Sequence, residues 1–520
     1  MKIKVIRNGK EIILEGTQDV SLLEQLRNNG IHLSAFCGGK GKCGKCKVQM
    51  VSGATEITGA DKKYLTEAEL SAGFRLACMA YPKGDCSLQV GSEEAGFEVV
   101  AEHCGNRQET GLLTEQDYDI SIDIGTTTIA MELIGESSRK ALHTVTAVNH
   151  QRAFGADVIS RIQASNEGQG GKLQETIRRD LSDGINRLME ESGAAGSRVR
   201  RIAIAGNTAM GHLLMGYSCK SLGVYPFTPV NIGTIKITAS KLLEAWKPEV
   251  LNSETEVVLL PGFSTYVGAD IAAGMLACDF DQREKPCLFV DLGTNGEMAV
   301  GNKNRILVAS TAAGPAFEGG NISCGMGSIP GAISSVSMEK GDVRIRTIGD
   351  KPPIGLCGTG VIEAVYELQK EGMVDETGML EEDYFEEGFE LAKTREGESI
   401  VFTQKDVREI QLAKSAVRAG IETLLKRYGI TYEEVEHVFL AGGFGYRMDV
   451  EKMVGIGMFP EELKNKTTAI GNSSLAGAAL YLALPEAEER LEKLVELSEE
   501  VGLSSDKDFN DFYMEYMFFS

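Results

Sequence analysis

Residues 37–46 read CGGKGKCGKC, and a further cysteine follows in the stretch RLACMAYP. The resulting pattern, C-x5-C-x2-C-x31-C, joins Cys37, Cys43, Cys46 and Cys78. Iron that is held by thiolates needs a loop that wraps the inorganic core, and the glycines here supply that freedom. The spacing therefore predicts a [2Fe-2S] cluster with these four ligands. Zinc is the alternative, but structural zinc sites usually offer two compact C-x2-C pairs, and only Cys43 and Cys46 form one.

The sequence around the cysteines predicts a small α+β domain over residues 1–92. Residues 2–16 alternate apolar and polar side chains on either side of an Asn-Gly pair, which indicates a β-hairpin. A short helix is expected over SLLEQLRNNG, with Ser21 as its N-cap, Glu24 completing a capping box, and Gly30 at its end. This arrangement resembles the adrenodoxin-like branch of [2Fe-2S] ferredoxins, which have a β-grasp fold. Lysines 40, 42, 45 and 47 surround the loop and could guide an acidic redox partner or balance the cluster charge.

Length and composition exclude several classes of protein. A chain of 520 residues is too long for one core, and its net charge of −22 disfavours nonspecific binding to nucleic acid. No apolar run approaches the roughly 20 residues that span a bilayer, and the first residues predict a strand without the features of a signal peptide. We therefore expect a cytoplasmic protein. The 11 cysteines do not suggest a disulfide framework, and the seven outside the cluster pattern are expected to be buried small residues or incidental.

A second domain is predicted after a linker or ordered strap at residues 93–116. It opens with YDISIDIGTTTIAMELIG, a strand, a turn and a second strand. Backbone N–H groups and threonine hydroxyls of such a hairpin can bind phosphate oxygens, and its aspartate can hold magnesium through water. CLFVDLGTNGEMAVGN repeats the pattern, and HVFLAGGFG adds a strand that runs into a glycine-rich turn suited to adenosine. Together the three segments predict a nucleotide cleft between two related lobes.

These motifs resemble those of the acetate and sugar kinase, Hsp70 and actin (ASKHA) superfamily, in the order phosphate 1, phosphate 2 and adenosine. The resemblance implies a two-lobed α/β ATPase domain over residues 117–485, with lobe I at about 117–285 and lobe II at about 286–485. Helical connectors are expected at 356–368 and 470–484. The resemblance also implies that magnesium and water are arranged by Asp123, Asp291 and Glu297. The implied nucleotide contacts are Gly125, Thr126, Thr127, Thr128, Gly293, Thr294, Asn295, Gly296, Gly442, Gly443, Phe444 and Gly445.

Other segments of this domain predict helices. Asp157 and Asp270 follow the same G-A dipeptide before apolar helices and are interpreted as N-caps. Asn207 and Thr208 begin a helix after a strand, where they could bind an anion or simply cap the helix. An apolar stripe within residues 407–424 predicts a core helix that ends at Gly429.

A [2Fe-2S] domain followed by this ATPase fold resembles the reductive activators of corrinoid proteins. The resemblance covers nearly the whole chain, including AFEGGNISCGM, FGADVISRI and QLAKSAVRAGI. It implies ATP-dependent transfer of one electron to Co(II), which regenerates Co(I) for a methyltransferase system of anaerobic metabolism. It also implies a low-potential electron donor, which the sequence does not name, and a homodimer. Some relatives carry an additional domain before the ATPase, for which the stretch before Asp123 leaves no room.

Energetics explain why both halves would be needed. A thiolate-ligated [2Fe-2S] centre lies near about −400 mV, and base-on Co(II) is harder to reduce, so ATP must change the acceptor or the complex. A redox-sensing, ATP-dependent binding protein and an activator of another low-potential enzyme stay open as alternatives. Residues 310–326 are a candidate corrinoid contact or a buried interdomain turn. Residues 486–520 form an acidic, aromatic strap that packs on the ATPase domain or docks a partner.

Overall fold

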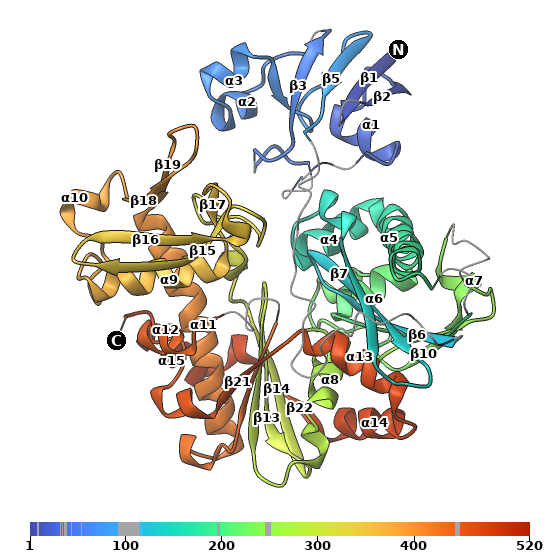
Figure 1. The fold of residues 1–520 in the computed structure, drawn as a ribbon, viewed down its shortest axis with the longest axis vertical. Coiled ribbons are helices and arrows are strands. Elements are labelled where there is room, and N and C mark those ends of the chain that lie inside the picture. The colour runs from blue at the N-terminus through green and yellow to red at the C-terminus, as the bar shows by residue number, and fades with distance from the viewer. Residues whose placement is uncertain are drawn as a thin grey trace.

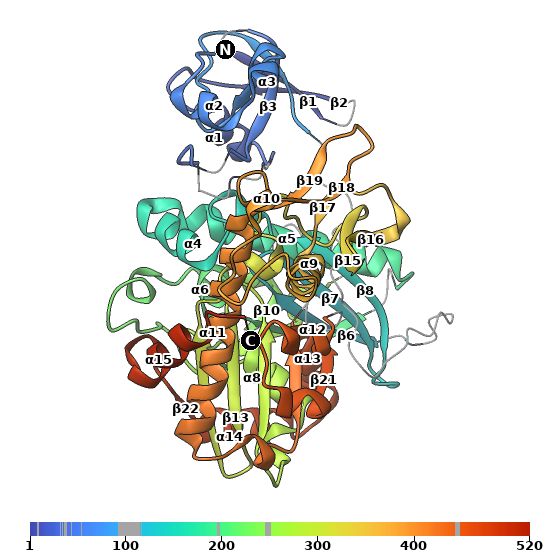
Figure 2. The ribbon, with the colours of Figure 1, turned by 90° about the vertical axis from the view of Figure 1, so that its left-hand side faces the viewer.

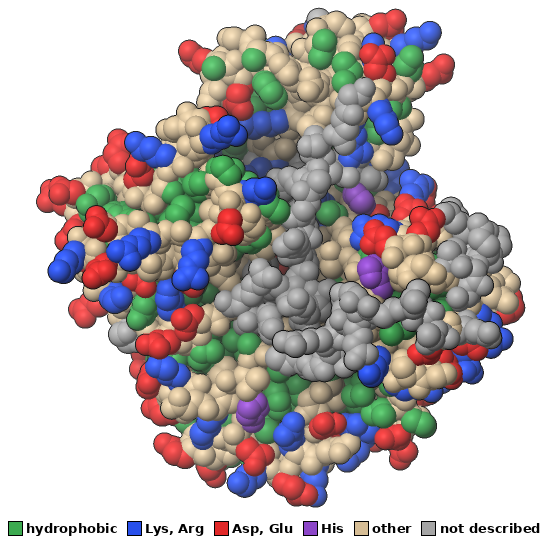
Figure 3. All heavy atoms as spheres, in the orientation of Figure 1, with side chains coloured by type: hydrophobic (Ala, Val, Ile, Leu, Met, Phe, Trp, Pro, Cys, Tyr) green, Lys and Arg blue, Asp and Glu red, His purple; other side chains and the backbone are tan. Residues whose placement is uncertain are grey.

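The computed structural model describes the chain except for residues 8–9, 32, 34, 36–38, 43, 54, 92–114, 116, 195–197, 245–250, 443–447 and 520. The ferredoxin domain lies above a larger two-lobed body, next to α4 (Val158–Ala164) and α5 (Gly170–Glu191) (Figures 1 and 2). On the opposite side, a notch separates it from the rest of the molecule (Figure 3). Most of the predicted linker, residues 93–116, lies outside the described residues.

The N-terminal domain is a five-stranded sheet with short helices, as the hairpin and helix patterns predict. Strand order is β2-β1-β5-β3-β4, and the central pair β1 and β5 is parallel. Ser21 caps α1 by accepting a hydrogen bond from the Glu24 backbone, and Gly30 has a φ of +74°. Among the described residues, the Glu24 side chain does not return the bond that would complete the predicted capping box. The elements are β1 (Lys2–Arg7), β2 (Lys10–Glu15), α1 (Leu22–Asn28), β3 (Lys47–Ser52), α2 (Gly59–Tyr64), α3 (Glu67–Ser71), β4 (Phe74–Leu76) and β5 (Cys86–Gln89).

The body contains two six-stranded sheets with equivalent cores. In each, three consecutive antiparallel strands are followed by two strands that add in parallel beside the first of them, and one further strand pairs at an edge of the sheet, which confirms the predicted ASKHA architecture. The first sheet has the order β10-β11-β9-β6-β7-β8, formed by β6 (Asp117–Ile124), β7 (Thr128–Gly135), β8 (Ala141–Val148), β9 (Arg198–Gly206), β10 (Ile235–Thr238) and β11 (Glu256–Leu259). The second has the order β21-β20-β12-β13-β14-β22, formed by β12 (Cys287–Leu292), β13 (Gly296–Asn302), β14 (Arg305–Thr311), β20 (Val438–Ala441), β21 (Thr467–Gly471) and β22 (Ser498–Glu500).

Two helices pack against each other where the lobes meet: α8 (Ala269–Ala277) and α13 (Ser473–Ala483). Their backbones approach so closely that a Cβ atom on Gly477 would lie 1.9 Å from the Ala273 carbonyl oxygen. Buried side chains of both helices and of both sheets, including Phe289 and Ala478, form one shared core. The small residues of α8 and of the predicted connector 470–484 thus allow the contact, and we call this helix pair the pivot. The other predicted connector, 356–368, lies in a helix elsewhere in lobe II, at Gly358–Lys370.

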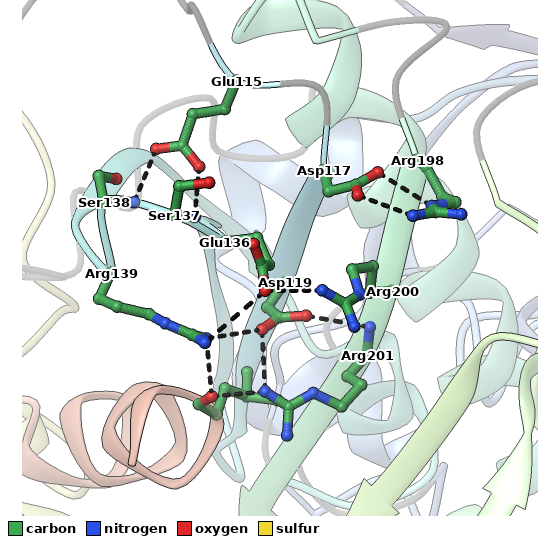
Figure 4. Close-up of polar contacts among 11 residues, drawn as sticks. Glu115, Asp117, Asp119, Glu136, Ser137, Ser138, Arg139, Arg198, Arg200 and Arg201 are labelled. Carbon is green, nitrogen blue, oxygen red and sulfur yellow. Dashed lines mark hydrogen bonds and ion pairs between the residues drawn. The ribbon is translucent and has the colours of Figure 1, made fainter. Parts of the chain in front are cut away.

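The far end of α13 is fixed to lobe I by an ion cluster around the buried Asp119. Arg139 and Arg201 are both directed at Asp119 of β6 (Figure 4), with nitrogen–oxygen distances of 3.7 and 3.1 Å. Both guanidinium groups also donate hydrogen bonds to the Leu482 carbonyl oxygen, at 3.2 and 2.5 Å. Lobe I therefore holds the last turn of a helix that follows β21 of lobe II.

Lobe II carries an insertion and a C-terminal strap. The insertion contains β15 (Ala332–Glu339), β16 (Asp342–Thr347), β17 (Gly355–Leu356), α9 (Gly358–Lys370), α10 (Glu382–Phe385), β18 (Phe389–Lys393) and β19 (Ser399–Phe402). Helix α11 (Gln404–Tyr428) ends at Gly429, which has a φ of +87°, as predicted. The strap packs along α11, and the buried Lys414 donates hydrogen bonds to the Tyr516 and Phe518 carbonyls.

The remaining helices are α6 (Thr208–Met215), α7 (Ala239–Leu242), α12 (Val450–Gly455), α14 (Ala487–Leu497) and α15 (Lys507–Glu515). Within the described part of the chain, no helix combines the length and apolar character needed to cross a membrane.

Candidate functional site

Two of the four predicted cluster ligands, Cys46 and Cys78, lie side by side in the ferredoxin domain. Both are buried, and the Ala77 backbone N–H donates to the Cys46 carbonyl at 2.7 Å. A hydrogen bond with the Cys78 thiol lowers the pKa of Cys46 to about 7, against the opposing effect of burial. A thiol that ionises near neutral pH, next to a second buried cysteine, suits a ligand of an iron–sulfur cluster. Cys37 and Cys43 lie outside the described residues.

Glycines shape the described part of the cluster loop. Gly41 and Gly44 have φ angles of +68° and +69°, which favour glycine. Added Cβ atoms there would lie 2.9 Å from the Met79 sulfur and 2.8 Å from the Tyr64 Cβ. Larger residues at either position would push the loop away from the domain that carries Cys78.

The first phosphate hairpin joins β6 to β7 and is held from behind by buried polar side chains. The Gly125 N–H donates to the Thr128 carbonyl at 2.9 Å, which closes the turn. Asn149 donates to the Gly125 carbonyl at 2.9 Å, and the buried Arg161 donates to the Thr126 carbonyl at 2.5 Å. With its carbonyls engaged, the turn keeps a fixed shape.

Asp123, at the end of β6, is held by lobe II. Its carboxylate accepts hydrogen bonds from Asn472 Nδ2 at 2.9 Å and from Ser474 Oγ at 2.7 Å, both at the start of α13. Burial raises the pKa of Asp123, and these two donors oppose the shift. Asn207 caps α6 through the Met210 N–H, as predicted, and its amide also donates to Thr126 Oγ1 at 3.1 Å.

The second phosphate hairpin joins β12 to β13 and repeats this design. The Gly293 N–H donates to the Asn295 carbonyl at 3.0 Å, and Asn295 Nδ2 donates to Glu297 at 3.2 Å. Asp291 and Glu297 are directly paired across the two strands. Gly296 lies at the start of β13, where it pairs with Leu292.

Carboxylates from both lobes converge between the hairpins. Burial raises the pKa of Asp291 to about 8, and the charges of Asp270 and Asp123 add to this effect. Burial also raises the pKa of Asp270 to about 7, with a further contribution from Asp123. The pKa of Glu297 is raised well above its usual value by burial and by the charges of Asp270 and Asp291. Mutual repulsion of this kind is relieved by a bound cation.

Two members of this carboxylate group were not predicted. Asp270 was expected to be an N-cap, which is wrong. Helix α8 begins at Ala269 with Gly268 as its N-cap, so Asp270 lies inside the helix and faces the other carboxylates. Asp157 does cap α4, as predicted, through the Ser160 N–H at 2.7 Å. Glu318 is the second addition, since it accepts a hydrogen bond from Thr294 Oγ1 at 3.0 Å and is also bonded to Thr127. It therefore touches both hairpins.

Glu318 belongs to the loop 310–326, for which we left two interpretations open. Ala316 and Phe317 are buried, and Glu318 lies between the two hairpins, so this part of the loop is a buried turn. Asn321 and Ser323 further along the loop are exposed.

The third motif brings Gly442 against the second phosphate hairpin. Gly442 has a φ of +99°, and a Cβ atom there would lie 2.4 Å from the Leu292 carbonyl oxygen and 3.0 Å from Asp291 Oδ1. Only glycine permits this approach. Gly443, Phe444 and Gly445 lie outside the described residues.

These features define a class: a ferredoxin domain joined to an ASKHA-type domain. Residues 5–83 match the family described as "2Fe-2S iron-sulfur cluster binding domain", residues 118–283 match "RACo middle region", and residues 285–520 match "C-terminal domain of RACo the ASKHA domain". The chain belongs to the RACo family, as the sequence resemblance predicted.

Named relatives cover most of the chain. The chain is 34% identical to "Corrinoid activation enzyme RamQ" of Eubacterium limosum, over 76% of this chain and 69% of the relative. It is 30% identical to "[Co(II) methylated amine-specific corrinoid protein] reductase" of Methanosarcina barkeri, over 76% of each. A solved structure of "Reductive activator for corrinoid,iron-sulfur protein" matches 99% of this chain and 98% of its own, with 26% identity and a TM-score of 0.71.

Proposed function

We propose that this chain is an ATP-dependent reductive activator of a corrinoid protein. It passes one electron from a [2Fe-2S] cluster to Co(II) and so regenerates Co(I) for a methyltransferase system. The proposal is carried by one observation: a ferredoxin domain and a pair of aspartate-bearing hairpins occur in one chain whose relatives bear names of corrinoid activation and Co(II) reduction. The electron comes from a separate low-potential donor.

In this proposal Cys37, Cys43, Cys46 and Cys78 hold the cluster. The cluster supplies a one-electron centre with a potential near about −400 mV. The protein contributes a glycine-rich loop, which presents backbone N–H groups to the cluster. It also contributes the buried Cys46–Cys78 pair, which excludes water from one side of the cluster.

The two hairpins bind the phosphates of Mg-ATP. Backbone N–H groups and hydroxyls of residues 125–128 and 293–296 hydrogen-bond the phosphate oxygens, and Gly442, Gly443, Phe444 and Gly445 line the adenosine. Asp123, Asp291 and Glu297 hold magnesium and the attacking water. Among the residues that the structure describes, no three Asp, Glu, His or Cys side chains converge closely enough to ligate one ion. Magnesium commonly takes one or two carboxylates and completes its shell with water and phosphate, so the arrangement fits contact through water.

Nucleotide binding drives the reaction through a change of conformation. A ligand that bridges the two hairpins pulls the lobes together, and the shared pivot of α8 and α13 transmits that movement. Closure of the complex then places the corrinoid protein in a state whose cobalt is easier to reduce. Within the loop 310–326, the exposed residues Asn321 and Ser323 are the candidate corrinoid contact.

The test is anaerobic reduction of a panel of Co(II) corrinoid proteins. The reduced protein is mixed with each, and the Co(I) absorption band is followed with and without Mg-ATP. We expect ATP-dependent Co(I) with at least one of them, and we expect Asp291→Ala to abolish only the ATP-dependent part. ATP hydrolysis and an intact cluster without Co(I) across the panel would instead favour a redox sensor or an activator of another enzyme.

A further inference from the structure

The ferredoxin domain rests on lobe I through its first helix and its cluster loop. Lys172 of α5 donates a hydrogen bond to Asn28 Oδ1 at 3.0 Å and pairs with Glu24 at 3.7 Å. Lys40, which lies in the cluster loop, pairs with Glu167 of lobe I at 3.7 Å. The cluster-bearing edge of the ferredoxin domain therefore faces lobe I.

Arg27, in the last turn of α1, is the central contact of this interface. Its guanidinium donates a hydrogen bond to the Ala153 carbonyl and lies 4.4 Å from the centre of the Phe154 ring. Both of these lobe I residues are buried. Its Nε atom is buried as well and has no acceptor among the residues that the structure describes. One donor thus binds lobe I, while a second buried donor is left over.

The backbone of α1, which carries Arg27, is fixed relative to the segment that carries Cys78. The Leu22 and Leu23 N–H groups of α1 donate to the Ala80 and Ala77 carbonyls, at 2.8 and 2.9 Å, and these alanines flank Cys78 in sequence. Burial lowers the pKa of Arg27, while Glu24 and the thiols of Cys46 and Cys78 raise it. Both thiols therefore lie within electrostatic reach of the guanidinium.

The lobe I side of the contact leads directly to the first phosphate hairpin. Ala153 ends a 3-10 turn (His150–Ala153) whose N-cap is Asn149. Asn149 is the residue that donates to the Gly125 carbonyl, and its own N–H donates to the Thr127 carbonyl at 3.0 Å. One turn of the chain separates the hairpin from the carbonyl that Arg27 binds.

We propose that Arg27 is a positioning residue that couples the cluster to the nucleotide: it fixes the Cys46–Cys78 edge of the ferredoxin domain to the turn that supports the first phosphate hairpin. The inference rests on the proposed function, because it requires nucleotide at that hairpin. A shift of the 149–153 turn on nucleotide binding moves the guanidinium relative to the ligand thiolates. Charges and hydrogen bonds at the sulfurs set the reduction potential of such clusters, so the potential changes with it.

Thermodynamic linkage makes the coupling measurable from either side. If nucleotide changes the reduction potential, then reduction changes nucleotide affinity by the corresponding factor. We expect the dissociation constant of a nonhydrolysable Mg-ATP analogue to differ by about fivefold or more between the oxidised and reduced full-length holoprotein, which is the lower end of ordinary allosteric coupling. Redox titrations with and without the analogue give the reciprocal value.

Three variants assign the effect. Arg27→Met removes both the charge and the donors, and it should abolish the difference between the two dissociation constants. Arg27→Lys keeps the charge but replaces the planar guanidinium that bonds Ala153 and covers the Phe154 ring, so it should reduce the difference. Lys172→Ala removes an exposed contact from lobe I without altering the ferredoxin domain, and it should also reduce the difference. Arg395→Met, on the exposed turn between β18 and β19, is the control and should behave as the wild type. The visible circular dichroism of the cluster reports whether each variant is intact.

The outcomes separate the two proposals. No binding of the analogue by the wild type would overturn both. Equal affinity in the two redox states would overturn the coupling and leave the ATP-dependent function standing. An undiminished difference in Arg27→Lys and Lys172→Ala would overturn the role of Arg27 even if Arg27→Met fails to assemble its cluster.

Discussion

Ser474 Oγ donates a hydrogen bond of 2.7 Å to Asp123 Oδ1, although the two residues are 351 positions apart in the sequence. Asp123 belongs to the first sheet, and Ser474 is the second residue of α13, the helix that follows β21 of the second sheet. The aspartate of phosphate hairpin one is therefore oriented by a side chain that reaches it only when both lobes are assembled. We infer that Ser474 is a positioning residue of the proposed nucleotide site.

Ser474→Ala should lower kcat/KM for ATP about tenfold, because a hydrogen bond to a buried charged group is lost. Burial raises the pKa of Asp123 and Ser474 opposes that shift, so its loss raises the pKa further. The acidic limb of the pH–rate profile should therefore move to higher pH. Ser473→Ala is the matched control, since the Ser473 hydroxyl has no partner among the described residues. Equal profiles for the two variants would contradict the role of Ser474.

Asp291→Asn should stabilise the nucleotide-free protein while abolishing ATP hydrolysis. The pKa of Asp291 is raised to about 8 in the folded state, against about 3.9 in an unfolded chain. Between these values the folded protein binds more protons than the unfolded chain, so stability falls as pH rises, by at most about 1.4 kcal/mol per pH unit for this group. The Tm advantage of the variant should thus be larger at pH 8 than at pH 5.

For the same experiment, Asp383→Asn in the exposed part of α10 is the control and should not change Tm at either pH. A Tm advantage of Asp291→Asn that is the same at both pH values would show that burial of the charge is not its cause.

Cys46→Ser should abolish the visible absorption of the cluster and all Co(I) formation, because a thiolate ligand is lost. Binding of a nonhydrolysable Mg-ATP analogue should persist, since the hairpins belong to other elements. Cys86→Ala, in a buried strand of the same domain, is the control and should keep the cluster spectrum. Retention of the spectrum in Cys46→Ser would remove this residue from the ligand set.

Arg201→Met should destabilise the body by about 3 kcal/mol, because it leaves the buried Asp119 carboxylate without a main partner. Arg198→Met on the same strand is the matched control: its partner Asp117 is exposed to solvent, so the change should be small. The double variant Arg201→Met/Asp119→Leu should recover much of the loss in thermal unfolding. Equal Tm values for the Arg201 and Arg198 variants would contradict the special role of Asp119.

Local sequence patterns predicted those parts of the fold that depend only on residues close to one another in the chain. Each Asp-X-Gly-Thr hairpin needs only its own turn to present N–H groups, so Asp123 and Asp291 could be placed from sequence. Gly30 and Gly429 adopt the left-handed conformation at the ends of their helices. This conformation depends only on the lack of a Cβ atom in glycine, so it could be predicted from the local sequence.

Asp270 and Glu318 could not be placed in this way, because their roles depend on contacts between distant segments. The Gly-Ala-Asp triplet at 268–270 is the same as the triplet at 155–157, whose aspartate caps α4. In α8 the helix begins earlier, and the packing of the pivot directs Asp270 toward the other carboxylates. Glu318 lay inside the recognised segment AFEGGNISCGM, but its contacts with Thr127 and Thr294 depend on both hairpins. Arg161 likewise lies in the segment FGADVISRI, but its hydrogen bond to the first phosphate hairpin was not predicted.

The backbone contact at Gly477 also limits how the lobes can move. No side chain separates Gly477 from the Ala273 carbonyl. Therefore no side chain at this contact can change its rotamer to accommodate a displacement of the helices. They can roll or slide over one another, but they cannot draw apart without breaking a close-packed seam. Any relative movement of the lobes at this seam is therefore limited to rolling and sliding of the two helices, and a single methyl group at position 477 would force their backbones apart.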